Sequence, residues 1–530
     1  MAEFGILSLL PPLVAIILAI WTKRVILALF AGVWIGGVMV SGWNPIAGTT
    51  QTLDWIVGNA IDDWNAKILL FDFLIGAGVG LIYKSGGAMA IAKALTKTVR
   101  TSRAASLMGW LLGVLVFFDD YTNTIIVGNT MRPITDKTRV SREMLAYIDD
   151  STAAPVAGLA LVSTWIGYEV GLIGDSFKDL GITLGPYAAW LSSVPYRFYS
   201  IFAIILVFLV AYTHRHYGAM LHAEYRARTE GKVLRDGAKP LMTTEIDLGM
   251  PKEGGNVHTF IWPILALVSV TLYGMWVTGG GGETFASDGI MGVLSNSDPA
   301  LALLWGSFAM VAVAFFLVVG MRIMTVEEAE TAIIQGMKQM IIANTILLLA
   351  WSIKSATDAV GTADYVVGIA SGKLPPGIVP LVVFFISMFI SFTTGTSWGT
   401  FSIMMPIAIP LAYHISGQAG PVLWASIGAV FAGGIFGDHC SPISDTTIMS
   451  SMFSGSDHVD HVTTQIPYAV TAASVGIILY IVFAIGIRTW IFLLPVGLVL
   501  LVMAHWVLSE WYGKIHGIPH GKVPVYVVEE

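Results

Sequence analysis

The chain has 530 residues, of which 55% are hydrophobic and only 12% are charged, and its formal net charge is −7. Its mean hydropathy is +0.75. Because about a quarter of the residues of a soluble domain are charged, this composition excludes an ordinary soluble globule and indicates a polytopic membrane protein. The single cysteine, Cys440, excludes an intrachain disulfide and a Cys-rich metal site.

The N-terminal segment, 1–24, is predicted to be a retained membrane helix. It lacks the basic start and the small-residue cleavage site of a signal peptide, and Pro11 and Pro12 interrupt its apolar run.

Lys and Arg concentrate in certain loops, which orients the predicted spans. Segments 84–103 and 214–258 are rich in Lys and Arg, whereas 43–65 and 279–298 contain acids and neither Lys nor Arg. Basic loops stay on the cytoplasmic side, so the first two segments are predicted inside and the other two outside. The apolar runs between these loops predict about eleven full spans and two re-entrant hairpins.

The first hairpin is predicted at about 105–138. An apolar run, ASLMGWLLGVLVFF, meets the polar DDYTNT, and a second run, IIVGNTM, leads to the basic RPITDKTRVSR. Both flanks are basic, so the chain is predicted to enter the membrane and return to the same side, with a polar tip at 119–124. Such a tip is tolerated only where protein buries it or where it lines a cavity. A broken helix is predicted next, at about 143–172, because Pro155 interrupts IDDSTAAPVAG.

The same two features recur in the second half of the chain. A hairpin at about 377–415 has the tip FTTGTSWGTF and flanks that hold one Lys, so it is predicted to enter from outside. A broken helix at about 422–452 follows, in which FGDHCSPISDT, with Pro442, resembles IDDSTAAPVAG. Interrupted helices in corresponding positions of two halves point to the binding site of a secondary transporter.

The predicted fold class is therefore an all-α polytopic membrane protein with two inverted-topology repeats. The predicted parts are a first transmembrane repeat at 1–213, a cytoplasmic linker at 214–258, a second transmembrane repeat at 259–487, and a C-terminal helix with a cytoplasmic tail at 488–530.

The hairpin tips and helix breaks hold residue types that bind a cation. A sodium ion needs several oxygen ligands, and broken helices supply backbone carbonyls beside carboxylate, amide and hydroxyl groups. The predicted substrate- and ion-binding residues are Asp119, Asp120, Thr122, Asn123, Asp149, Asp150, Ser151, Thr152, Thr394, Thr396, Ser397, Asp438, His439, Ser441, Asp445 and Thr446. The predicted ligands of Na+ are Asp438, Asp445, Asn123 and Asp150.

Each of these residues also has a structural interpretation. The acids could pair with Lys or Arg, and Arg142 is close enough in sequence to reach Asp149. His439 is predicted either to shuttle protons or to satisfy backbone carbonyls at the break. A buried carboxylate for which Na+ and H+ compete is sufficient for antiport.

Several other residues carry weaker predictions. Asp72 lies inside a predicted span and has either an ion role or a hydrogen-bonding role between helices, and Lys354 is predicted to extend toward the membrane interface. A second set is considered for lining the cavity, namely Trp165, Tyr168, Glu169 and Trp398.

The stretch GDHCSPISDTTIMSS (437–451) closely resembles the signature of NhaC-type Na+/H+ antiporters. TTGTSWGTF, FFDDYTNT and AYIDDSTAAPVAG are similar to other segments of that family, and the resemblance covers roughly residues 60–470. The resemblance implies membership of a wider group of ion transporters, with inverted repeats, re-entrant hairpins, homodimeric assembly and an elevator-type motion.

The expected function is exchange of Na+, with Li+ as a second candidate ion, for H+ across the inner membrane of a prokaryote. The alternative is a Na+- or H+-coupled exchanger or symporter of a small organic acid or amino acid. No enzymatic activity, cofactor or nucleic-acid partner is expected. The alternative of another class is a membrane-embedded hydrolase or a channel, but a zinc protease would need HExxH or a comparable ligand set, and none occurs on the predicted membrane helices. The expected partners are Na+, H+, the lipid bilayer and a second copy of the chain.

Overall fold

The computed structural model describes residues 4–22, 24–96, 99–240, 251–252, 255–370 and 374–528. The regular structure in these ranges is helical, with 23 α-helices and four short 3-10 helices, and strand-like pairing is limited to isolated bridges. The prediction of an all-α protein is confirmed.

The first part of the chain builds twelve helices, of which the last, α12, lies inside the linker. These are α1 (Leu10–Thr22), α2 (Val25–Val40), α3 (Pro45–Ile61), α4 (Asp63–Lys84), α5 (Gly87–Thr96), α6 (Ser102–Leu115), α7 (Asp120–Lys137), α8 (Arg142–Ala157), α9 (Thr164–Leu180), α10 (Pro186–Ser193), α11 (Phe198–Thr213) and α12 (Ala219–Glu230).

The remaining helices follow the linker. These are α13 (His258–Thr278), α14 (Gly281–Asn296), α15 (Pro299–Gly320), α16 (Val326–Ala359), α17 (Thr362–Ala370), α18 (Val379–Thr394), α19 (Ser397–Ser416), α20 (Pro421–Cys440), α21 (Asp445–Ser454), α22 (His458–Ala484) and α23 (Trp490–His516).

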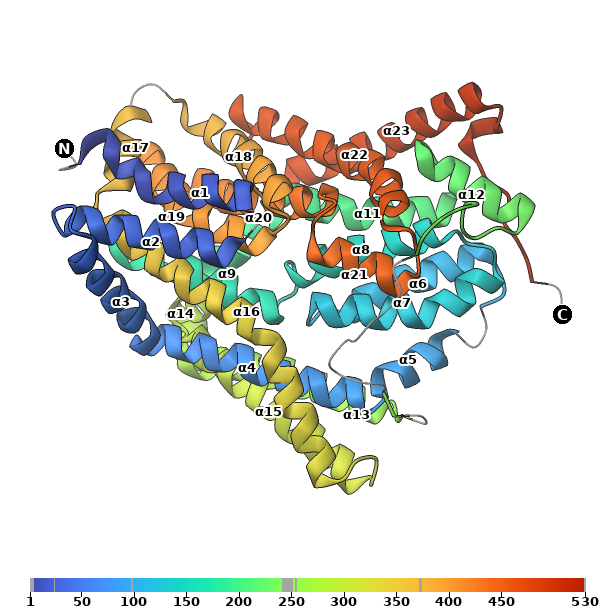
Figure 1. Cartoon of the computed structure of the whole chain (residues 1–530), viewed down its shortest axis with the longest axis horizontal. Coiled ribbons are helices and arrows are strands. Elements are labelled where there is room, and N and C mark those ends of the chain that lie inside the picture. Colours follow the sequence, from blue (N-terminus) through green and yellow to red (C-terminus); the bar gives the residue numbers. More distant parts are fainter. Residues whose placement is uncertain are drawn as a thin grey trace.

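Most helices run roughly along the long axis of the molecule, with the N-terminus at one end and the C-terminus at the other (Figure 1). Helices α4, α13, α15 and α16 pack along one side, and α7, α8 and α21 pack against one another at the centre. Helices α18, α19 and α20 form a second packed group. Segments from both halves of the sequence therefore meet at the centre.

Two helix pairs fold back on themselves. Helix α6 packs against α7 across the short connection 116–119, and α18 packs against α19 across 395–396. Figure 1 shows the first pair in the half of the molecule that carries the C-terminus, and the second pair in the half that carries the N-terminus. The two turns point from opposite ends toward the middle.

Two further helices are interrupted. Helix α8 ends at Ala157 and α9 begins at Thr164, whereas α20 ends at Cys440 and α21 begins at Asp445. Pro442 lies in its break, but Pro155 lies inside the last turn of α8, so this interruption falls three residues later than the proline. A proline removes one N–H but can remain in a helix, and the new helix starts where Ser163 caps it.

Polar caps begin the helices around the centre. The side chains of Asp119, Ser163, Thr396 and Ser444 accept hydrogen bonds from the first turns of α7, α9, α19 and α21. Such caps satisfy N–H groups that would otherwise be unpaired in the membrane interior. Part of the polarity at the tips is therefore structural.

Within the described ranges, nine helices are long and apolar enough to cross a membrane, or ten if the bent pair Pro186–Tyr196 and Phe198–Thr213 counts as one span. This count includes both helices of the second predicted hairpin, Pro376–Thr394 and Ser397–Ser416, so the predicted number of about eleven full spans stays a prediction. The apolar parts of α1, α2 and α6 are shorter than the others. Some apolar runs in the sequence therefore form apolar helices that are shorter than a full membrane span.

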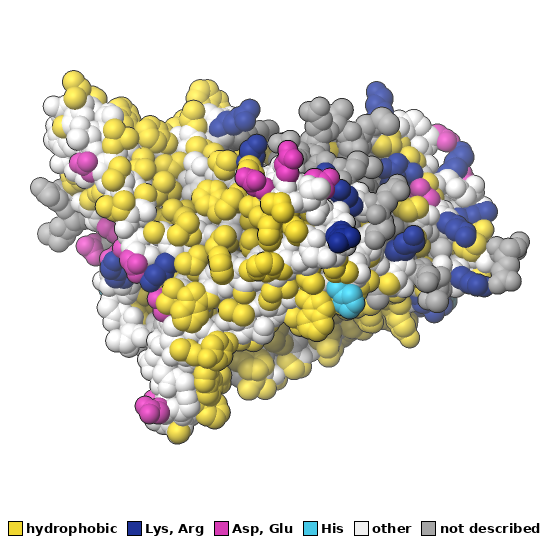
Figure 2. All heavy atoms as spheres, turned by 90° about the horizontal axis from the view of Figure 1, so that it is seen from below, with side chains coloured by type: hydrophobic (Ala, Val, Ile, Leu, Met, Phe, Trp, Pro, Cys, Tyr) yellow, Lys and Arg dark blue, Asp and Glu magenta, His cyan; other side chains and the backbone are white. Residues whose placement is uncertain are grey.

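The outer surface of the protein is apolar, as a surface that faces lipid must be. Figure 2 shows hydrophobic side chains across the middle of one face, with Lys and Arg gathered mainly toward one end. Large apolar side chains are exposed on the outer helices, among them Tyr273, Phe308, Phe316 and Ile342. A continuous apolar surface of this kind is expected of a protein embedded in lipid.

The linker 214–258 is partly folded against the helices, and its residues 241–250 and 253–254 lie outside the described residues. Arg226, on α12, forms an ion pair with Glu143 at the start of α8, in which Nη2 donates to both carboxylate oxygens at 2.8 and 3.1 Å. The C-terminal tail also reaches this end, where Arg139 lies 4.3 Å above the ring of Tyr526. The linker thus fixes the base of α8.

The contact between α6 and α8 depends on Gly113. A Cβ atom at this position would lie 1.9 Å from Thr152 Oγ1 and 2.6 Å from its Cβ. We expect Gly113→Ala to destabilise the protein by about 1–3 kcal/mol, because overpacking forces such contacts apart. The measurement is thermal unfolding in detergent.

The matched control is Gly58→Ala in α3, where a Cβ would meet no described atom within 4 Å. This control should leave the melting temperature unchanged or raise it slightly. An equal loss of stability in both variants would contradict the role of Gly113.

Candidate functional site

A cavity of about 340 Å³ lies where the turn of the first hairpin meets the two helix breaks. Its walls come from α7, α9, α16, α19 and α21 and the residues that cap them. The lining residues are Asp119, Asp120, Tyr121, Ile125, Thr164, Gln339, Met340, Ile342, Ala343, Ile346, Thr396, Trp398, Asp445, Met449, Met452 and Phe453.

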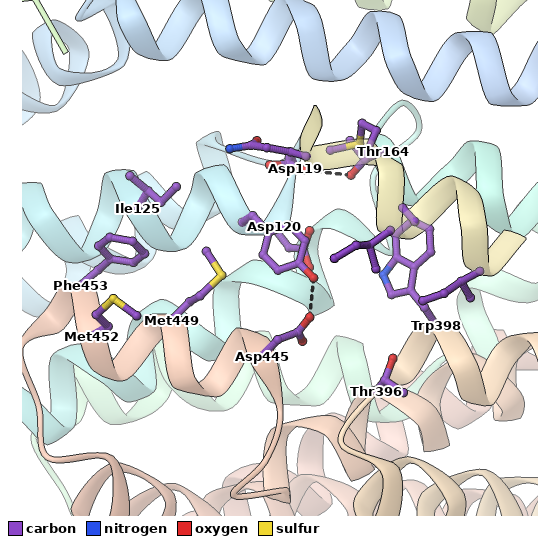
Figure 3. A pocket seen from close by; sticks show the side chains of 16 residues that line it. Asp119, Asp120, Ile125, Thr164, Thr396, Trp398, Asp445, Met449, Met452 and Phe453 are labelled. Atoms are coloured by element: carbon purple, nitrogen blue, oxygen red, sulfur yellow. Dashed lines mark hydrogen bonds between the residues drawn. The ribbon is translucent and has the colours of Figure 1, made fainter. Parts of the chain in front are cut away.

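The carboxylate of Asp119 is held by its own helix and by α9. It accepts hydrogen bonds from the Thr122 backbone N–H at 2.8 Å and from Thr122 Oγ1 at 2.6 Å. Thr164 Oγ1 donates to its other oxygen at 3.2 Å, as Figure 3 shows. Asp119 is therefore a cap that ties the hairpin to the start of α9.

Asp120 and Asp445 face each other across the cavity (Figure 3). Asp120 is 2% exposed. Asp445 is an exposed residue, and it accepts a hydrogen bond of 2.5 Å from the hydroxyl of Tyr121. These carboxylates lie on two helices from opposite halves of the chain.

A second polar cluster lies behind the cavity, around Asp150 on α8. The carboxylate accepts from Thr447 Oγ1 at 3.0 Å and from Gln465 Nε2 at 2.6 Å, and Ser450 Oγ lies 3.4 Å away. His461 Nε2 is 3.9 Å from the carboxylate. Asp150 is fully buried, so these donors provide the polar contacts that an ionised carboxylate requires.

Asp438 lies on the other side of the first turn of α21. Thr446 Oγ1 donates to one carboxylate oxygen at 3.0 Å. The other oxygen, Oδ1, is buried and has no hydrogen-bond partner in the described part of the chain. Thr446 and Thr447 are adjacent, so they link Asp438 and Asp150 to the same helix start.

His439 joins three helices. Its Nε2 lies 3.1 Å from the carbonyl oxygen of Asp150 and its Nδ1 lies 3.0 Å from the hydroxyl of Tyr199. One tautomer satisfies both contacts, with Nε2 donating and Nδ1 accepting. The histidine therefore satisfies a backbone carbonyl, as one of the two interpretations expected, but this carbonyl lies inside α8 and not at the break.

Asp149 differs from its neighbour Asp150. It is fully buried, and neither carboxylate oxygen has a partner among the residues that the structure describes. Its Oδ2 lies beside Gly128, where an added Cβ would be 2.9 Å away. The predicted pairing of Asp149 with Arg142 is not formed, because Arg142 binds Asp136 at 2.9 Å.

Asn123 holds the hairpin in place. Its Nδ2 lies within 3.0 Å of three backbone carbonyls, those of Gly113, Val116 and Thr152. Its Oδ1 is buried without a partner in the described ranges. The amide thus satisfies carbonyls at the end of α6 and inside α8, and leaves one acceptor free.

The remaining predicted hydroxyls have different positions. Thr152 and Thr394 donate to carbonyls of their own helices, and Thr396 caps α19 and lines the cavity. Three more are buried, namely Ser151 inside α8, Ser397 at the start of α19 and Ser441 at the break after α20.

The four predicted Na+ ligands are distributed over this region. Asp438 and Asp150 flank the start of α21, Asp445 faces the cavity, and Asn123 lies at the contact of α6 with α8. Among the described residues, no group of three or more His, Cys, Asp or Glu is arranged to hold a metal ion. Sodium coordination by these residues stays a prediction.

Several site residues were not predicted from the sequence. Tyr121, Thr164, Gln465 and His461 contact the acids or line the cavity. The spacing of His461 and Gln465 by four residues inside an apolar helix was a usable signal, because it puts two polar side chains on one helix face.

Of the four residues considered for the cavity wall, Trp398 lines it. Trp165 is fully buried and packs on Trp398, with ring centroids 5.6 Å apart, and Tyr168 bonds to the backbone of Trp398 at 2.5 Å. Glu169 forms an ion pair of 2.6 Å with Arg197, and both side chains are fully buried. Trp165, Tyr168 and Glu169 are not among the lining residues, and Glu169 is paired instead with an arginine 28 residues later.

Arg197 also donates to the carbonyl of Gly158, at the break after α8. We expect Arg197→Met to cost about 3–5 kcal/mol, because it leaves a buried carboxylate unpaired. The double variant Glu169→Gln/Arg197→Met should recover most of this loss. Thermal unfolding in detergent measures both, and a double variant no more stable than the single one would contradict the pairing.

Lys354 does not extend to the interface as predicted. It is 7% exposed and is surrounded by Asp175, Asp179 and Asp358, with Asp358 at 2.8 Å. Asp72 is also buried, and its carboxylate oxygens have no partner within the part of the chain that is described. Hydrogen bonding between helices is therefore not observed for Asp72.

Comparison with known proteins bears on these results. The sequence profile of the Na+/H+ antiporter family matches residues 156–485. An uncharacterized protein of Haemophilus influenzae is 37% identical over 491 residues, which are 90% of each chain. The malate-2H+/Na+-lactate antiporter of Bacillus subtilis is 28% identical over 156 residues, which are 29% of this chain and 32% of that protein.

The solved structure of Neisseria gonorrhoeae MtrF, described as one of a class of antimetabolite efflux pumps, is also similar. It has a TM-score of 0.54 at 15% identity and covers 83% of this chain and 84% of that one. This likeness concerns the fold alone. The resemblance to NhaC-type antiporters is confirmed: the chain belongs to the Na+/H+ antiporter family and is a multi-pass membrane transporter of Na+/H+ type.

Proposed function

We propose that the protein is a secondary active transporter that exchanges Na+, with Li+ as a second ion, for H+ across the inner membrane of a prokaryote. Na+ binds at the start of α21, between Asp438 and Asp150. The observation that carries this proposal is the buried, unpartnered Oδ1 of Asp438 at the break between α20 and α21.

The chemistry of that position suits a small cation. An unpartnered ionised oxygen inside a protein costs about 1–3 kcal/mol or more, and a bound Na+ or H+ removes this cost. The hydroxyls of Thr446 and Thr447 and the C-terminal carbonyls of α20 are oxygen ligands within the same turn. Na+ is the substrate, and the proposal requires no cofactor.

Asp149 is the group that carries the proton. The donors around Asp150 favour a carboxylate there, whereas the absence of donors around Asp149 in the described structure favours the neutral acid. The two residues are adjacent, so a Na+ ion arriving at Asp150 favours loss of the proton from Asp149. Binding of one ion then opposes binding of the other, which is the requirement for antiport.

The proposal includes two inverted-topology repeats, an elevator-type motion and a homodimer. It is supported by the two helical pairs that turn back from opposite ends of the molecule (Figure 1) and by the interrupted helix that follows each pair.

The test is proton flux in sealed proteoliposomes that contain a pH dye, on addition of Na+, Li+ or K+, with no organic solute present. We expect a pH change with Na+ or Li+ and none with K+. A protein that is folded and silent with all three ions would refute direct Na+/H+ exchange.

A second candidate function is transport of an organic solute coupled to Na+ or H+. The cavity favours it, because apolar side chains make up much of the wall beside the carboxylates. The Bacillus subtilis relative is named as an exchanger of malate and lactate, but three carboxylates line this cavity and no described lining residue is basic, so an organic cation fits it better than an organic acid.

A further inference from the structure

We infer that the 340 Å³ cavity binds an organic ammonium ion that carries an apolar group, as a second substrate beside Na+. This inference rests on the proposed function, since it assigns a further substrate class to the same transporter. It follows from the size, the charge and the apolar wall of the cavity.

The cavity is larger than Na+ requires. One water molecule takes about 30 Å³ of liquid volume, and pockets for small organic molecules begin at roughly 300 Å³. The buried oxygen cluster around Asp438 and Asp150 provides an ion site of its own behind the cavity. A space of about 340 Å³ in front of it fits a small organic molecule.

The charge of the lining selects a cation. Asp119, Asp120 and Asp445 contribute three carboxylates, and none of the described lining residues is Lys, Arg or His. Asp120 and Asp445 are directed into the space (Figure 3). Arg197, a buried arginine of the core, is paired with Glu169 and is not among the lining residues. An organic anion would meet like charge here, with no described basic group to offset it.

Apolar side chains flank the acids in the cavity wall. Figure 3 shows Met449, Met452 and Phe453 on one side of the carboxylates and Trp398 on the other. Methionine side chains adapt to irregular apolar groups, and a tryptophan face attracts an ammonium group. A hydrated metal ion would gain nothing from these side chains, whereas an ammonium ion with an apolar body would contact both kinds of wall.

The experiment uses labelled benzyltrimethylammonium, which stays charged at every pH, and the full-length protein in nanodiscs. We expect saturable binding that unlabelled probe displaces, and that the anion phenylacetate and the neutral benzyl alcohol do not. Absence of saturable binding overturns the inference. Equal displacement by benzyl alcohol also overturns it, because the cavity would then be an apolar space for lipid.

Two variants test the location of the bound probe. Asp120→Asn should weaken binding about tenfold or more, since a desolvated cation loses its counter-charge. Met449→Trp should abolish binding by filling the cavity, whereas the control Met503→Trp, at an exposed position on α23, should bind normally. Size-exclusion profiles identify misfolded variants, and unchanged binding in a folded Asp120→Asn protein overturns the inference.

The same preparations separate this inference from the proposed function. Na+-driven proton flux without any organic cation tests the exchange itself. Proton flux without probe binding would refute the organic-cation site and support Na+/H+ exchange. Probe binding without such flux would support the site and refute direct Na+/H+ exchange.

Discussion

Asp438→Asn is expected to reduce sodium-driven proton exchange strongly at low Na+ concentration while the protein stays folded. The substitution removes the charge of a carboxylate whose Oδ1 is buried and unpartnered in the described chain, at the break between α20 and α21. Loss of a charged ligand costs about 1.5–3 kcal/mol, so the affinity for Na+ should fall by roughly 10- to 150-fold. Proton flux at low Na+ concentration should fall by a similar factor.

The measurement is dye-reported proton flux in proteoliposomes over a series of Na+ concentrations. Asp54→Asn is the matched control, because Asp54 is an exposed residue on α3, away from the centre. It should leave the flux unchanged. Normal Na+ dependence in a folded Asp438→Asn protein would eliminate Asp438 as a ligand.

Asp149→Asn should uncouple protons from Na+ without abolishing Na+ binding. An amide resembles the neutral acid in shape but cannot release a proton, and Asp149 has no hydrogen bond to a described residue that the change would break. Coupling between two sites is typically about 1–3 kcal/mol, a factor of roughly 5–150. We therefore expect wild-type Na+ affinity to fall by such a factor at low pH, and the variant's affinity to be nearly independent of pH.

Equilibrium binding of radioactive Na+ across a pH series measures this effect, and proton flux in proteoliposomes should be lost in parallel. Asp150→Asn is the informative comparison, because that carboxylate accepts hydrogen bonds from Thr447 and Gln465 and is proposed to hold Na+. It should weaken Na+ binding at every pH. If Asp149→Asn behaved in the same way, the assignment of separate roles to the two acids would be wrong.

The contrast between Asp149 and Asp150 could not be read from their sequence. Both are acids in the same apolar segment, and the same proline, Pro155, follows both of them. Their side chains project from α8 in different directions, one toward Gly128 and the other toward Thr447 and Gln465. Which acid finds donors depends on α21 and α22, about 300 residues later, and no local pattern contains that information.

The sequence by itself determined the helical class, the membrane environment and the helix break at Pro442. Apolar runs of about 20 residues can only be helices in lipid, and Pro442, with Ser444 as a cap, ends one helix and begins the next. The family signature in 437–451 depends on the same local residues. These features follow from residues that are neighbours in the chain, so they could be predicted.

Only the tertiary structure decided how the charges are satisfied. The pairing of Arg197 with Glu169, the enclosure of Lys354 by three acids and the contact of Tyr121 with Asp445 each join different helices. An ionisable side chain inside a membrane protein must find a partner of opposite charge or become neutral. The sequence does not say which helix supplies that partner. The packing of the helices therefore separates the acids that are neutralised within the fold from those that are left for ions.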